Sequence, residues 1–75
     1  MPHVIVKLWP GRSEQEKAAL AEAIVRDVIK ITGSGEKSIS VAIEEIDPGD
    51  WKDKVYQPDI IEKSETLYRK PGYSM

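Results

Sequence analysis

The chain has 75 residues, no cysteine and one histidine, and its 13 acidic and 11 basic side chains give a net charge of −2. This composition excludes disulfides and cysteine metal sites, disfavours a histidine metal site, and lacks the basic excess of a nucleic-acid-binding protein. No apolar run approaches the roughly 20 residues of a membrane span, and charges and prolines interrupt the start too early for a signal peptide. We therefore expect one cytoplasmic domain over residues 1–75, without a metal, nucleic-acid or membrane partner.

The first predicted element is a strand from Pro2 to Trp9, in which β-branched and aromatic residues alternate between two faces. Proline at position 2 is small enough for Met1 to be removed, and we expect this removal to leave a free secondary amine. An α-amino group has a pKa of about 8, and burial or a nearby cation lowers that pKa toward neutrality. The sequence therefore presents Pro2 as a candidate general base.

The second predicted element is an amphipathic helix that begins with a capping box between Ser13 and Glu16. Gly33 is a natural terminator. Between them, apolar residues recur at helical spacing and predict one buried stripe: Leu20, Ile24, Val28 and Ile31.

A second strand is predicted from Ser38 to Ile46, followed by a turn over residues 47–50. Pro58 then favours the first turn of a shorter helix, roughly Asp59 to Arg69. Its expected buried face consists of Ile60, Ile61 and Leu67.

The order strand, helix, strand predicts an α/β fold built on a parallel βαβ unit with a short C-terminal helix. A two-stranded sheet with one helical layer has open edges and little core, so it is marginal in water when alone. We therefore expect oligomerisation that extends the sheet across a two-fold axis.

Two further residues are candidates for a binding site. Arg12 lies between the first strand and the helix, where its guanidinium and the helix N-terminus both favour a carboxylate. Trp51 follows the turn and can form a pocket wall or part of a subunit interface.

In combination, these features resemble the 4-oxalocrotonate tautomerase family over nearly the whole chain. The resemblance rests on Pro2 opening a strand, on Gly11-Arg12-Ser13 ahead of Glu16-Lys17, on the strand Ser38-Ile39-Ser40-Val41 and on the aromatic Trp51. The C-terminal stretch through residues 70–75 is similar to that of the short dimeric members that act on phenylpyruvate-like enols.

The resemblance implies that Pro2 is catalytic, that Arg12 binds the substrate and that Trp51 is the pocket aromatic. The family's second arginine corresponds to Ser40, whose hydroxyl is then a candidate substitute. The implied activity is a cofactor-independent keto–enol tautomerase for 2-oxo monocarboxylic acids, acting as a homodimer more readily than a hexamer.

Two alternatives stay open at the level of sequence. A hydratase or dehalogenase on the same scaffold would use a cationic Pro2 as an acid and a carboxylate, Asp50 or Asp53, to activate water. A non-catalytic oligomeric binding protein would need no free amine at Pro2.

Overall fold

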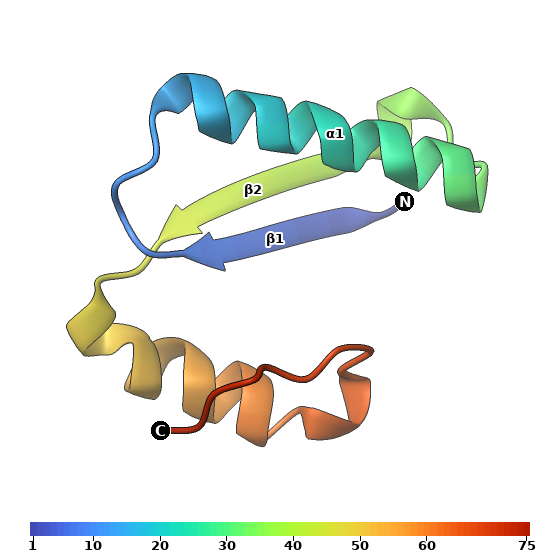
Figure 1. Ribbon diagram of the computed structural model, residues 1–75. Coiled ribbons are helices and arrows are strands. Elements are labelled where there is room, and N and C mark those ends of the chain that lie inside the picture. The colour runs from blue at the N-terminus through green and yellow to red at the C-terminus, as the bar shows by residue number, and fades with distance from the viewer. The chain divides into compact units, whose positions relative to one another are not determined.

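The computed structural model describes residues 1–75, which divide into two units, Met1–Glu45 and Ile46–Met75. The first unit contains two strands, a long helix and a short 3-10 helix, and the second contains only short helical segments and a C-terminal tail (Figure 1). The expectation of a single domain over residues 1–75 stays a prediction.

The strands β1 (His3–Leu8) and β2 (Ser40–Glu45) form a parallel two-stranded sheet in which His3 pairs with Ser40 and Leu8 with Glu45. This confirms the predicted α/β fold with a parallel βαβ unit. The second strand begins two residues later than predicted, because Ser38 belongs to the 3-10 helix η1 (Glu36–Ser38). The amide and the hydroxyl of Ser38 both donate to the Gly35 carbonyl, at 3.0 and 2.7 Å. The Ser38 backbone therefore forms a turn and does not pair with the neighbouring strand.

The helix α1 (Glu14–Thr32) connects the strands and begins with the predicted capping box. The Glu16 amide donates to Ser13 Oγ at 3.0 Å, and the Ser13 amide donates to Glu16 Oε1 at 2.9 Å. At the other end Gly33 has a φ of 74°, a conformation that favours glycine, and its amide donates to the Ile29 carbonyl at 2.9 Å. Both helix ends were therefore encoded locally.

One face of the sheet is covered by α1, mainly over β2 (Figure 1). Val41 and Ile43 of β2 line the same hollow as Ala18 and Ala21 of the helix. Because side chains alternate along a strand, the other face, here called the open face, carries three cross-strand pairs: His3 with Ser40, Ile5 with Ala42, and Lys7 with Glu44.

The first unit buries its apolar residues only partly. No side chain of residues 1–45 is buried, Ile5 is 50% exposed and Ile31 is 80% exposed. A two-stranded sheet of this kind gains too little from burial to be stable by itself. The partial burial supports the expectation that the sheet associates with another copy.

The second unit contains η2 (Pro48–Asp50), the π-helix η3 (Lys52–Ile61) and η4 (Ser64–Thr66). The prediction of a helix from Asp59 to Arg69 was wrong: the helix starts seven residues earlier, and Pro58 lies in its interior rather than in its first turn. Proline removes one amide donor. The wider bonding, seen where the Glu62 amide donates to the Gln57 carbonyl at 2.9 Å, keeps the helix continuous past it.

The buried residues of this unit also differ from the predicted set. Val55 and Tyr56 are 5% and 7% exposed, whereas Ile61 of the predicted face is 47% exposed. The ring of Tyr56 lies 5.8 Å from that of Tyr73, which holds the tail against η3. No helix of either unit combines the length and the apolar character that crossing a membrane would require.

We expect Ser13→Ala to lower the free energy of unfolding by about 1 kcal/mol, because the Glu16 amide loses its acceptor at the start of α1. Urea denaturation of both proteins measures the change. Ser74→Ala in the exposed tail is the matched control and should stay within about 0.5 kcal/mol of the wild type. Equal losses in the two variants would contradict the capping role.

Candidate functional site

Pro2 lies directly before β1 and is tied to the sheet. It is half-buried, and its carbonyl accepts a hydrogen bond from the Ser40 amide at 3.2 Å. Met1 before it is fully exposed. With Met1 attached the Pro2 nitrogen is an amide, so basicity at this position requires removal of that residue.

Ser40 and His3 lie next to Pro2 at the same end of the sheet. The His3 imidazole Nδ1 and Ser40 Oγ are 2.6 Å apart, which is a short hydrogen bond between the two strands. Both residues are exposed on the open face. Sequence reasoning identified Ser40 only because it occupies the position of the family's second arginine. Its contact with His3 depends on the parallel register of the two strands.

Arg12 lies at the opposite end of β1, in the loop that leads into α1. Its side chain is 69% exposed, and its guanidinium Nη1 is 4.0 Å from Glu16 Oε2. With Leu8, Lys17 and Leu20, Arg12 and Glu16 line a hollow of about 140 Å³. A cation beside a small apolar hollow is suited to a carboxylate that carries an apolar group.

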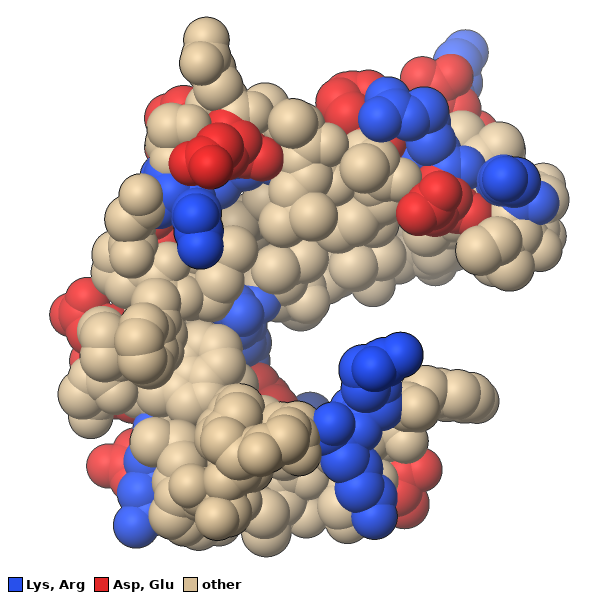
Figure 2. Space-filling view, in the orientation of Figure 1, with Lys and Arg blue, Asp and Glu red and all other residues tan.

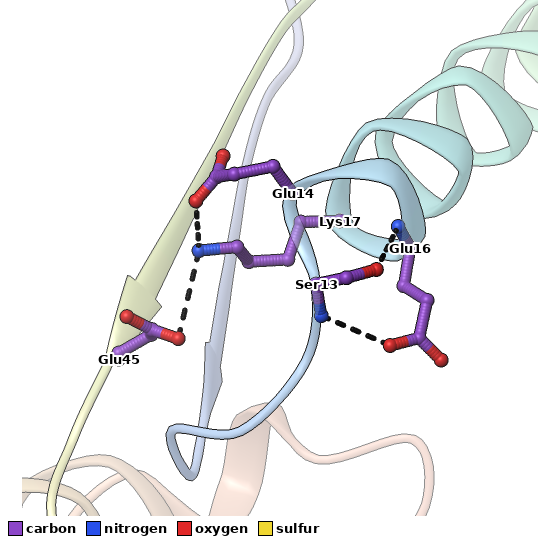
Figure 3. A network of polar contacts seen from close by, with 5 residues as sticks. All are labelled: Ser13, Glu14, Glu16, Lys17 and Glu45. Carbon is purple, nitrogen blue, oxygen red and sulfur yellow. Dashed lines mark hydrogen bonds and ion pairs between the residues drawn. The ribbon is translucent and has the colours of Figure 1, made fainter.

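The pKa of Glu16 is lowered, first by its hydrogen bond from the Ser13 amide and to a smaller extent by the charge of Arg12. One carboxylate thus caps the helix and faces the guanidinium (Figure 3 shows the cap). This arrangement keeps Glu16 ionised and partly offsets the positive charge of Arg12.

Lys17 joins the start of α1 to the end of β2. Its ammonium lies 2.8 Å from Glu14 Oε1 and 3.5 Å from Glu45 Oε2 (Figure 3). The hydrogen bond to Glu14 raises the pKa of Lys17. Sequence spacing could have indicated the pair with Glu14, but only the fold brings Glu45 to the same ammonium. The bridge helps to fix the loop that carries Arg12.

Pro2 and Arg12 do not meet within one chain. They lie at opposite ends of β1, and a strand of six residues separates its ends by about 20 Å at 3.3 Å per residue. A small ligand cannot span this distance. A site that contains both residues must therefore take them from different copies of the chain.

Trp51 is half-buried in the second unit, at the start of η3. Its indole Nε1 donates to the Tyr73 hydroxyl at 2.9 Å. Tyr73, with Tyr56 and Lys70, also lines a hollow of about 250 Å³. The sequence contained no signal for this link between Trp51 and the tail, because 22 residues separate its two partners.

On the face drawn in Figure 2, acidic and basic groups lie next to each other. No group of three or more His, Cys, Asp or Glu residues is arranged to hold a metal ion.

Comparison with known proteins gives consistent matches. The family described as "Tautomerase enzyme" matches residues 2–53. Tautomerase PptA of Pectobacterium carotovorum subsp. carotovorum (strain PC1) is 48% identical over 75 residues, which cover 99% of each chain. Tautomerase PptA of Escherichia coli (strain SMS-3-5 / SECEC) is 42% identical over 76 residues, covering 100% of each.

Among solved structures, TomN, a 4-oxalocrotonate tautomerase homologue in the tomaymycin biosynthetic pathway, is similar in fold and sequence. The match has a TM-score of 0.65 and 38% identity, and it covers 67% of this chain and 77% of that chain.

The lowered pKa of Glu16 predicts an acid-sensitive helix start. A carboxylate whose pKa is lower in the folded protein than in the unfolded chain stabilises the fold at pH values above its ordinary pKa of 4.5. This stabilisation disappears as the pH falls through the pKa of the folded state. Glu16→Gln keeps a capping-box side chain but does not titrate. We therefore expect unfolding free energy to fall less in Glu16→Gln than in the wild type between neutral pH and values below 4.5.

Urea denaturation across this pH range measures the difference. Glu22→Gln, at an exposed helical position, controls for the loss of one carboxylate and should retain the wild-type slope. An identical slope in wild type and Glu16→Gln would show that the Ser13–Glu16 bond makes no pH-linked contribution.

Proposed function

Because the chain belongs to the tautomerase family, we propose that it is a cofactor-independent keto–enol tautomerase of 2-oxo monocarboxylic acids, with Pro2 as general base and acid. The observation that carries this proposal is the position of Pro2, which is held in the sheet by Ser40 rather than frayed. A fixed amine can be aligned with a substrate proton, as general base catalysis requires.

In the proposed reaction, the neutral amine of Pro2 removes the hydroxyl proton of a 2-hydroxy enol. The electron pair of that O–H bond forms the 2-oxo group, and the carbon–carbon double bond takes a proton from the resulting prolinium at C3. The amine returns to its starting state. One nitrogen transfers one proton, so atoms and charge balance without a cofactor.

The carboxylate of the substrate is assigned to Arg12 of a second copy, because Pro2 and Arg12 of one chain lie too far apart. This geometry supports a homo-oligomer, and we propose a homodimer. Glu16 offsets part of the Arg12 charge, which favours a monoacid over a diacid. Trp51 is the proposed aromatic wall and Ser40 the proposed polar contact to the substrate.

We expect Pro2→Ala to lower turnover by about 10² to 10⁴, the range for loss of a general acid–base group. The assay is ketonisation of phenylenolpyruvate, and intact mass must first show that Met1 is absent from both proteins. Alanine also permits Met1 removal, so the processed variant replaces the ring-constrained secondary amine by a flexible primary amine. Wild-type turnover in processed Pro2→Ala protein would refute the assignment of Pro2.

A site shared between copies predicts complementation. Pro2→Ala and Arg12→Ala should each be impaired, the second mainly through a higher KM because carboxylate capture weakens. Unfolding and refolding the two variants together at equal concentrations should restore about a quarter of the wild-type sites, since that fraction combines an intact Pro2 with an intact partner Arg12. Refolding each variant alone is the control. If the mixture has no more activity than the separately refolded variants, the proposal of a site shared between copies is wrong.

A further inference from the structure

The hydrogen bond between His3 and Ser40 is unusual for its surroundings. Both side chains are exposed, yet Nδ1 and Oγ are 2.6 Å apart across two paired strands. An exposed pair must offset the entropy of ordering two side chains and the competition of water. The parallel register, which places the two residues directly beside each other, reduces that cost.

Ser40 is also held from its backbone. Its amide donates to the Pro2 carbonyl at 3.2 Å, so one residue contacts both Pro2 and His3. Neighbouring strands lie about 5 Å apart, so Ser40 is the residue of β2 that lies beside Pro2 at this end of the sheet.

The next pair on the open face is apolar. Ile5, half exposed, pairs with Ala42, and the charged pair of Lys7 and Glu44 lies one step further. Along the open face, the polar pair nearest to Pro2 is therefore followed by a pair of apolar residues. This order matches a substrate with an oxygen near the amine and an apolar tail beyond it.

We propose that His3 is a positioning residue that orients the Ser40 hydroxyl toward the oxygen at C2 of the substrate, an inference that rests on the proposed tautomerase function. A hydroxyl has one proton to donate and two lone pairs. When His3 Nδ1–H donates to Ser40 Oγ, the hydroxyl proton stays available for the substrate. The hydrogen bond from the Ser40 hydroxyl to the C2 oxygen strengthens as that oxygen becomes negative during proton transfer.

The effect should appear mainly in kcat, because the bond matters most while charge develops. Removal of one hydrogen-bond donor from a buried oxyanion site lowers kcat by a factor of about 10² to 10³. At this more exposed site we expect kcat to fall about tenfold or more. His3→Leu and His3→Asn have similar size, but only asparagine can donate toward Ser40. His3→Asn should therefore retain most of the activity that His3→Leu loses.

A double-mutant cycle provides the test, with phenylenolpyruvate as substrate and proteins lacking Met1. His3→Leu and Ser40→Ala should each lower kcat, and the double variant should be no worse than Ser40→Ala alone, because His3 acts through the hydroxyl. Additive losses, or a His3→Leu variant with wild-type kcat, would overturn the proposal.

Two controls separate this proposal from the one on which it rests. Thermal unfolding and native mass of each variant show whether the fold and assembly persist, and Ser40→Thr, which keeps a hydroxyl, should remain active. If wild type and Pro2→Ala are equally slow, the tautomerase assignment itself fails. If Pro2→Ala alone is slow while both His3 and Ser40 variants turn over normally, only the positioning role fails.

Discussion

In a parallel pair, both strands begin at the same end of the sheet. This constraint determines where each candidate residue of the first unit lies. The Ser40 amide bonds to the Pro2 carbonyl, and from there the register runs from His3 to Leu8. A slip of one residue would turn each side chain to the opposite face. Pro2, the His3 imidazole and the Ser40 hydroxyl are therefore kept at one end of the sheet by backbone pairing.

The same pairing separates Pro2 from Arg12, since a strand cannot bring its two ends together. It also leaves the sheet with two strands and a face that no element of the first unit covers. Association with another copy would address both problems at once. It would bury apolar surface that a single copy leaves exposed, and it would bring an arginine toward Pro2 of a different chain. In the proposed enzyme, assembly and catalysis thus have one physical origin.

The start of α1 connects the stability of the helix with the position of Arg12. Glu16 closes the capping box with Ser13 and faces Arg12, while Lys17 bridges Glu14 and Glu45. The contacts of Glu16 with Ser13 and Arg12, and of Lys17 with Glu14, hold the loop at low entropic cost, because their partners are three or four residues apart. The contact of Lys17 with Glu45 depends on the fold instead. The position of Arg12 is consequently part of the helix start rather than a property of a free surface loop.

Sequence alone determined the elements whose signals are local: the alternating β1, the capping box, the glycine end of α1 and the tautomerase-family resemblance through Pro2 and Arg12. It did not determine the second unit, because Pro58 is typical of a first helical turn, whereas the π-helix η3 starts before it and continues past it. Nor did it indicate the Tyr73 contact of Trp51 or the bond between His3 and Ser40. These pairs are 22 and 37 residues apart, and no local pattern records them. Only the tertiary structure decided them, because strand register and chain return, rather than propensity, set which distant side chains come within hydrogen-bonding distance.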